Sequence, residues 1–155
     1  MTKNKYLSLF FILLITFIAS AVGGFVTTSY KEPWYSELIL ASFNPPSWVF
    51  APVWTTLYIF MSIAIWRIWI NFFNIKLLQI YFFHLFFNSI WSIIFFGFHL
   101  PLLALIDIVI ILFFIIYLIK NYFKLDKMSY YLTIPYLIWS LYAFVLNLSI
   151  VILNI

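Results

Sequence analysis

Long apolar runs separated by short polar breaks dominate the pattern of hydrophobic and polar positions along this chain. A membrane-spanning helix needs about 20 predominantly apolar residues, and five segments meet that requirement. The last three breaks are only a few residues long, so successive helices must be antiparallel neighbours in one compact bundle. The pattern predicts an all-α integral membrane protein, a five-transmembrane-helix bundle with spans at about 7–26, 47–70, 77–98, 101–123 and 130–152.

The first connection, about residues 27–46, is the longest, and it is rich in tryptophan and proline. Asn44 precedes two prolines, a combination typical of a helix start with Asn44 as the cap. Pro52 would then lie about two turns into the second span, where a proline removes a backbone hydrogen bond and is expected to kink the helix. We find no repeat or linker, and expect residues 1–155 to form a single membrane domain.

The first span has an alternative interpretation. Lys3 and Lys5, the apolar run 7–18 and the small residues 19–21 also resemble a signal peptide with its cleavage site. Against cleavage, the apolar character continues to Val26, which makes the segment long enough to span a bilayer.

Composition agrees with a lipid environment. The chain is 67% hydrophobic and only 8% charged, whereas soluble domains carry about 25% charged residues. The formal net charge of +4 therefore does not indicate nucleic-acid binding. The absence of cysteine excludes disulfides, thiolate metal sites and cysteine nucleophiles.

The basic residues are better understood as markers of topology. With five spans, the amino terminus and the second and fourth loops share one side of the membrane, and basic residues concentrate on the cytoplasmic side. The opposite side carries only Lys31. We therefore expect a cytoplasmic amino terminus if the protein lies in an inner membrane. The residues on the amino-terminal side are Lys3, Lys5, Arg67, Lys76, Lys120, Lys124 and Lys127.

Aromatic side chains in the second span form a stripe. Trp54 and Tyr58 are four residues apart and so share a helix face. Trp34, Tyr35 and Trp48 suit an aromatic belt at the membrane surface. Trp54 lies too deep for that belt, on the order of 15 Å from the expected helix start. It is either an ordinary packing residue or part of a pocket wall.

Polar residues inside the other spans complete a candidate cavity. Asn88, Asn147 and Asp107, the only acidic residue within a span, should face the bundle interior because polar groups are costly in lipid. They would either hold helices together, at about 1 kcal/mol per hydrogen bond, or line a site. A cavity that suits a flat, apolar, conjugated ligand would then be lined by Trp54, Tyr58, Asn88, Trp91, Trp139 and Ala143.

The sequence gives little support for metal binding or for acid–base catalysis. His84 and His99 are too few for a metal cluster, and no acid–base pair or triad is apparent. His84 is either a hydrogen-bonding residue or a haem ligand. We expect no metal site and no required cofactor.

The order and spacing of several motifs resemble the TspO/MBR family, which includes tryptophan-rich sensory proteins, translocator proteins and the peripheral benzodiazepine receptor. The resemblance covers about residues 5–155. It is carried by Trp34-Tyr35, Asn44-Pro45-Pro46, Trp48-Val49-Phe50, Val53-Trp54, Leu57-Tyr58, Phe87-Asn88, Trp91, Phe95-Phe96-Gly97, Pro135 to Trp139 and Leu146-Asn147.

This resemblance implies a five-helix bundle, often dimeric, that binds porphyrins and related tetrapyrroles beneath a lid formed by residues 27–46. In some bacterial members it also implies light-dependent porphyrin breakdown, with Trp54 and Trp139 as the candidate catalytic residues. Leu40, Ala41 and Phe43 depart from the family's usual Lys-Pro pair and tryptophan, and no basic residue follows Tyr142 to complete a cholesterol motif. By matching position, the ligand-binding residues are Tyr35, Pro46, Phe50, Trp54, Tyr58, Asn88, Trp91, Asp107, Trp139 and Ala143.

Three hypotheses follow. The first is a receptor, sensor or transporter for tetrapyrroles or another flat apolar ligand, embedded in the bilayer of a bacterium as a homodimer. The second is light-driven porphyrin degradation, although the sequence favours a binding protein over an enzyme. The third is a regulatory membrane partner protein without small-molecule turnover.

Overall fold

The computed structural model describes residues 4–154, which fold almost entirely into helices. Lys3, one of the residues that carry the predicted charge bias, lies outside this range. The elements, in order, are α1 (Lys5–Tyr30), α2 (Trp34–Glu37), the 3₁₀ turn η1 (Ser47–Val49), α3 (Phe50–Phe72), α4 (Ile75–Ser92), the π-helical segment η2 (Ile93–Gly97), α5 (Pro101–Leu125) and α6 (Lys127–Leu153).

Local sequence explains where most of the long helices begin. Asn4, Asn74 and Asp126 each precede a helix, and their side chains accept hydrogen bonds from backbone N–H groups of the first turn. Pro101 opens α5 at a position where a missing N–H costs nothing. Helices bond their own backbone groups, which suits a lipid environment; the exception is Pro135 inside α6, which has no N–H to donate to the preceding turn.

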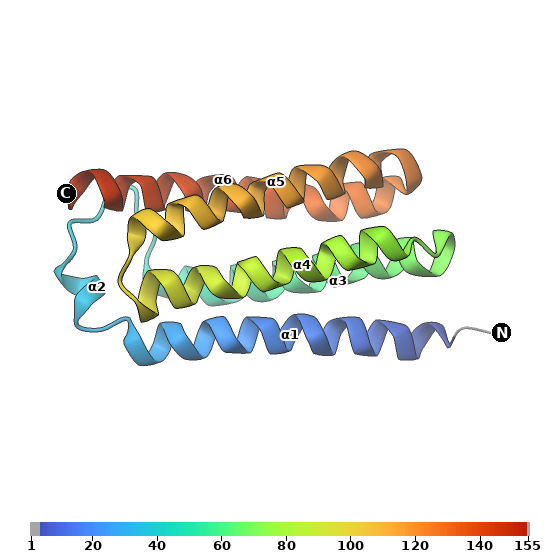
Figure 1. Cartoon of the computed structure of the whole chain (residues 1–155), viewed down its shortest axis with the longest axis horizontal. Helices are drawn as coiled ribbons and strands as arrows, with labels where there is room; N and C mark the ends of the chain where they lie inside the picture. The colour runs from blue at the N-terminus through green and yellow to red at the C-terminus, as the bar shows by residue number, and fades with distance from the viewer. Residues whose placement is uncertain (1–3, 155) are drawn as a thin grey trace.

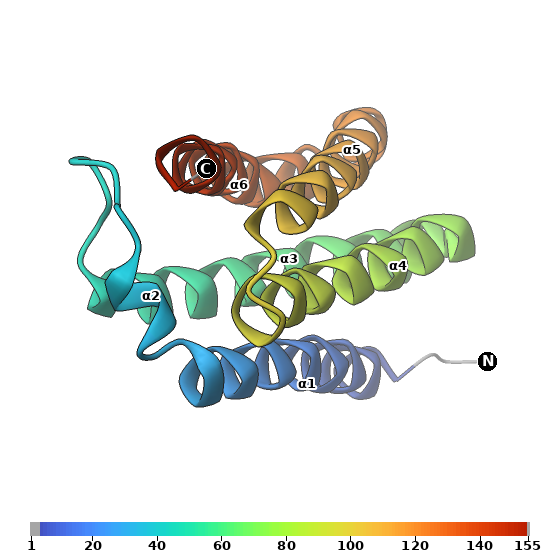
Figure 2. The ribbon, with the colours of Figure 1, turned by 60° about the vertical axis from the view of Figure 1, so that its left-hand side comes forward.

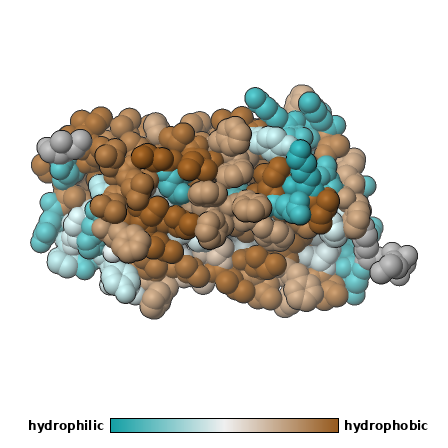
Figure 3. All heavy atoms as spheres, in the orientation of Figure 1, coloured by the Kyte–Doolittle hydropathy of each residue, from teal (hydrophilic) through white to brown (hydrophobic). Residues whose placement is uncertain are grey.

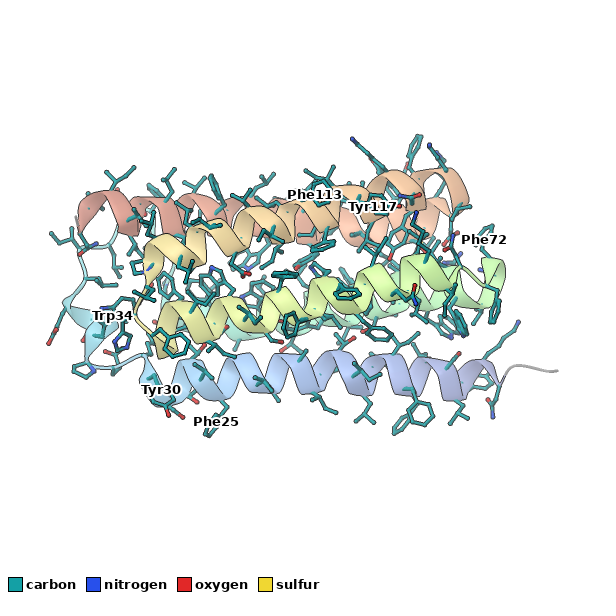
Figure 4. All side chains as sticks on the ribbon, in the orientation of Figure 1. Phe25, Tyr30, Trp34, Phe72, Phe113 and Tyr117 are labelled. Atoms are coloured by element: carbon teal, nitrogen blue, oxygen red, sulfur yellow. The ribbon has the colours of Figure 1, made fainter. Side chains whose placement is uncertain are left out.

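The five long helices confirm the predicted fold class. Five segments are long and apolar enough to cross a membrane, and they correspond to the predicted spans. Exposed apolar side chains cover the bundle; Phe25 on α1 and Phe113 on α5 are 68% and 67% exposed and point away from it (Figure 4). Hydrophobic residues dominate the middle of the face shown in Figure 3, with polar residues gathered toward its ends. The chain is a multi-pass integral membrane protein.

The helices form three tiers, with α1 in the first, α3 and α4 in the second and α5 and α6 in the third (Figures 1 and 2). Contacts close these tiers into a ring, because α1 packs against α3 and α4, α3 packs against α6, α4 packs against α5, and α5 packs against α6. The two ends of the chain lie at opposite ends of the bundle (Figure 1). The short helix α2 lies at the same end as the carboxyl terminus.

The start of the second span differs from the prediction. The α-helix begins at Phe50 after a 3₁₀ turn, and Asn44 makes no cap; its side-chain amide donates to the Pro45 carbonyl. The backbone N–H of Asn44 is bound instead to the Ala41 carbonyl within the loop. Pro52 consequently lies in the first turn of α3, where proline is tolerated, so the reason for expecting a kink two turns into the helix was wrong.

The half of the bundle nearest the amino terminus is densely packed. Its core includes Ile65, Ile68 and Ile115, all with no exposed surface. The Thr16 hydroxyl shares a 2.7 Å hydrogen bond with the Tyr81 hydroxyl, which ties α1 to α4 in this half. Further along, the Ser89 hydroxyl donates to the Ala19 carbonyl. These contacts tie α1 to α4 within the bundle.

Candidate functional site

The other half of the bundle is hollow. A cavity of about 540 Å³ lies between the long helices beneath α2 and the loop that precedes α3. Volumes of about 300–1,000 Å³ are typical of sites for drug-sized ligands. All five long helices and the loop contribute to its wall.

The structure brings together most of the residues predicted for the site. Pro46 is not among the residues that line the cavity, and neither is Asp107, although Asp107 is buried as expected. Its Oδ2 atom has no hydrogen-bond partner within residues 4–154. The predicted residues that line the cavity are Tyr35, Phe50, Trp54, Tyr58, Asn88, Trp91, Trp139 and Ala143.

Aromatic rings make up much of the cavity wall. The rings of Trp54 and Tyr58 on α3 are stacked, with centroids 5.5 Å apart and an interplanar angle of 28°. Trp91 stacks on Phe95 at 4.9 Å, and Phe50 meets Trp139 edge to face at 5.9 Å. These contacts fix the rings as flat walls before any ligand arrives, which lowers the ordering cost of binding.

Polar side chains at the inner end of the cavity form hydrogen bonds with one another, although His84 Nδ1 has no partner within the described residues. The Tyr58 hydroxyl donates to Asn88 Oδ1 at 2.5 Å, and Asn88 Nδ2 donates to the Tyr136 hydroxyl at 3.1 Å. That hydroxyl also lies 2.6 Å from His84 Nε2. His84 has no exposed surface and does not line the cavity. It is therefore a structural hydrogen-bonding residue in this arrangement, and the haem-ligand alternative loses its geometric basis.

Two polar groups in the wall remain without partners. Trp91 Nε1 donates to Asn147 Oδ1 at 3.2 Å, and Asn147 Nδ2 donates to the Pro101 carbonyl at 2.9 Å. By contrast, Trp139 Nε1 and Ser140 Oγ are buried and make no hydrogen bond to any part of the chain that the structure describes. Buried donors without partners are costly, and both of these adjacent residues on α6 line the cavity.

The mouth of the cavity carries charge. Lys31, at the end of α1, lines the opening, and its Nζ donates to Ser47 Oγ at 3.1 Å and lies 4.9 Å from the Tyr35 ring centroid. Burial raises the pKa of the Tyr35 hydroxyl above its ordinary value, so this group stays neutral at physiological pH. Glu32 also lines the opening, and its Oε1 lies 3.6 Å from Lys31 Nζ, so the rim carries an ion pair beside a neutral hydroxyl.

The loop over the mouth, which we call the lid, is fastened to the bundle by hydrogen bonds. The Asn154 side chain pairs with both backbone groups of Ile39, at 2.9 Å and 3.0 Å. The Tyr142 hydroxyl donates to the Phe43 carbonyl at 2.6 Å. In α2, Trp34 stacks on His99 in the α4–α5 turn, with ring centroids 4.4 Å apart (Figure 4).

Sequence reasoning missed the contribution of α1 to the site. Ser20, Gly24 and Thr28 line the cavity but carry little chemistry that a sequence pattern could single out. It also missed Phe95 and Phe96, which a π-helical turn brings into the wall. Phe95 and Phe96 belong to a motif that carries the family resemblance, but nothing in that motif indicated that they line the cavity. Within the described residues, no cluster of three or more His, Cys, Asp or Glu side chains could hold a metal ion.

Fold and site together define a five-span membrane protein with a ligand-sized aromatic cavity under a loop. The chain belongs to the TspO/MBR family, whose profile matches residues 11–153. It is 38% identical to the tryptophan-rich protein TspO of Archaeoglobus fulgidus, covering 85% of this chain and 87% of that one. It is 34% identical to the tryptophan-rich sensory protein of Cereibacter sphaeroides, with coverage of 92% and 91%. Identity to the human translocator protein is 30%, with coverage of 84% and 82%.

Proposed function

We propose that this protein is a membrane receptor, sensor or transporter that binds a porphyrin or related tetrapyrrole in the cavity. The observation that carries the proposal is the combination of flat aromatic walls with two unpartnered polar groups, Trp139 Nε1 and Ser140 Oγ. A macrocycle would stack against the rings, and an acceptor atom of the ligand would meet the Trp139 N–H. Lys31 at the mouth, now 3.6 Å from Glu32 Oε1, would exchange this exposed ion pair for one with a propionate.

The test is a titration of purified protein with protoporphyrin IX, followed by quenching of intrinsic tryptophan fluorescence. Wild type is expected to bind saturably. Trp139→Phe keeps an aromatic ring but removes the donor, and should raise Kd about five- to tenfold, the equivalent of one neutral hydrogen bond. Trp48→Phe is the matched control, because Trp48 is 75% exposed and does not line the cavity.

The outcomes separate the hypotheses. An unchanged Kd in Trp139→Phe, with saturable binding retained, would remove Trp139 as an anchor. No saturable binding by wild type would contradict the proposal and favour a regulatory partner protein. In that case, affinity purification from membranes should recover another membrane protein.

A second candidate function is light-dependent porphyrin degradation. The observation that favours it is that Trp54 and Trp139 line the same cavity, where either indole could pass an electron to a photo-excited macrocycle. The reduced macrocycle would pass that electron to dioxygen, the indole radical would recover an electron from the ring, and the resulting superoxide would add to the oxidised ring. Illumination should then bleach the porphyrin Soret band faster with protein than with the same concentration of free tryptophan, and Trp54→Phe should slow the bleaching. Equal rates with protein and with free tryptophan would exclude this activity.

We further propose that the amino terminus is cytoplasmic and that the protein is a homodimer. Basic residues gather at or near the helix ends on the amino-terminal side, and Lys31 lies at the other end of α1. This is the arrangement that basic residues adopt around a cytoplasmic face. The residues on the amino-terminal side are Lys5, Arg67, Lys76, Lys120, Lys124 and Lys127.

The dimer is supported by the family resemblance. Light scattering on the protein in detergent would measure the assembly mass, and the mass of a single chain would contradict the dimer.

A further inference from the structure

One wall of the cavity reaches the lipid-facing surface between α1 and α3. Gly24 and Thr28 on α1, four residues apart, line the cavity and are also exposed. Ala51 and Thr55, four apart on α3, have the same two properties. Exposed residues on two neighbouring helices that also line a cavity are where it can open sideways; we call the position between these four residues the lateral window.

Two contacts between α1 and the α3 side limit the lateral window, one at each end. Toward the middle of the bundle, Phe17 on α1 meets Tyr58 on α3, with ring centroids 6.5 Å apart. Toward the lid, Lys31 Nζ donates to Ser47 Oγ and joins the end of α1 to the start of η1. Between these contacts, Gly24 and Thr28 lie about one helical turn apart, about 6 Å along the axis of α1.

The rim of the lateral window presents no free hydroxyl donor. The Thr28 hydroxyl donates to the Gly24 carbonyl at 3.0 Å, and the Thr55 hydroxyl donates to the Ala51 carbonyl at 2.8 Å. The neighbouring Thr27 hydroxyl donates to Gly23 in the same way at 2.8 Å. With their polar atoms satisfied by their own helices, these residues can face hydrocarbon at little cost.

The two adjacent glycines of α1 have different roles. A Cβ added at Gly23 would lie 3.0 Å from Ser92 Oγ, so this glycine permits close packing of α1 on α4. A Cβ added at Gly24 would meet nothing within 4 Å. Gly24 therefore borders open space, and a larger side chain there would partly fill the lateral window without disturbing a packed contact.

We propose that the ligand enters and leaves the cavity sideways, from the membrane leaflet nearest the lid, through the lateral window between α1 and α3. The inference rests on the proposed function, since it needs an apolar ligand that dissolves in the bilayer. Passage beneath the lid would require breaking its hydrogen bonds to Asn154 and Tyr142. The lateral window leads directly to the cavity that Trp139 and Ser140 line, and Ser140 is only 2% exposed and keeps an unpartnered hydroxyl.

The experiment measures rates as well as affinity. Wild type in lipid nanodiscs is mixed rapidly with protoporphyrin IX, and association and dissociation are followed by tryptophan quenching. Gly24→Leu should slow both association and dissociation about tenfold, because a blocked route raises the barrier in both directions, whereas a mere loss of contact with the ligand would speed dissociation. Ala21→Leu is the matched control, since Ala21 is exposed on the same helix and does not line the cavity.

Two further variants keep the test decisive. Thr55→Leu narrows the lateral window from α3 and should slow both rates even if Gly24→Leu folds poorly. Asn154→Ala loosens the lid and should leave both rates unchanged. Wild-type rates in both window variants, or faster rates in Asn154→Ala alone, would overturn the lateral route. Failure of wild type to bind at all would instead contradict the proposed function.

Discussion

At the residue scale, one ion pair joins the amino-terminal end of α6 to α3. Arg67 Nε and Nη2 donate to the two carboxylate oxygens of Asp126 at 2.7 Å and 3.0 Å. Asp126 Oδ2 also accepts from the backbone N–H and hydroxyl of Ser129, at 3.1 Å and 2.6 Å. The Asp126 carboxylate therefore caps the start of α6 and also forms a bidentate ion pair with Arg67.

This pair predicts a pH-dependent contribution to stability. The hydrogen bonds from Arg67 and Ser129 hold the pKa of Asp126 well below its usual range. A carboxylate whose pKa is lower in the folded state stabilises the fold above its unfolded pKa of about 3.9, and that contribution is lost as pH falls below this value. Asp126→Asn should keep the cap but reduce the free energy of unfolding by about 1–2 kcal/mol near pH 7.

Thermal unfolding in detergent between pH 3 and 7 checks this prediction. The difference in Tm between wild type and Asp126→Asn should be largest near neutral pH and should shrink as pH drops below about 4. Glu37→Gln, a change to an exposed carboxyl in α2, is the control. A Tm difference that stays constant across the whole range would contradict the assignment.

At the element scale, the lid depends on polar contacts with α6. The Asn154 carboxamide makes two hydrogen bonds to Ile39: it accepts from the backbone N–H and donates to the carbonyl. Apolar burial adds Trp34, Tyr35, Leu38 and Leu40, which pack around a small core formed by Phe95, Ala104 and Ile150. The lid is therefore seated by hydrophobic contact and fixed in position by a few hydrogen bonds.

Asn154→Ala should loosen this lid without unfolding the bundle. Each neutral hydrogen bond contributes about 0.5–1.5 kcal/mol, so amide hydrogen exchange at Ile39 is expected to quicken about tenfold or more. Exchange in the middle of α6 should not change. Ser149→Ala is the control, because that hydroxyl donates only to the Leu146 carbonyl of its own helix. Equal exchange at Ile39 in wild type and Asn154→Ala would show that the lid is held by packing alone.

The limits of prediction are also clearest at this scale. The spans follow from apolar length, and the inward position of Asn88 and Asn147 follows from the cost of burying amides in lipid. The cavity wall on α1 does not follow, because glycine and threonine at Gly24 and Thr28 carry no periodic signal. The π-helical turn that places Phe95 depends on how α4 meets its neighbours, which no local pattern encodes.

At the scale of the whole molecule, the bundle is asymmetric along its length. One end is packed and carries Arg67, Lys76 and other basic residues, whereas the other end holds the cavity, the lid and Lys31. If the basic end is cytoplasmic, the lid and the lateral window belong to the outer half of the membrane. A ligand would then exchange with the outer leaflet, and the packed half would block its passage to the cytoplasm.

Single cysteines test this orientation cleanly, because the sequence contains none. Ser42→Cys places a thiol in the exposed loop of the lid, and Met128→Cys places one beside the α5–α6 turn, where Met128 is 52% exposed. In intact bacterial spheroplasts, a membrane-impermeant maleimide should label Ser42→Cys and spare Met128→Cys. Permeabilisation should make both reactive, which shows that the second thiol is protected by the membrane rather than by the fold. The reverse pattern would place the cavity in the cytoplasmic leaflet, and the direction of ligand exchange inferred from the charge distribution would reverse with it.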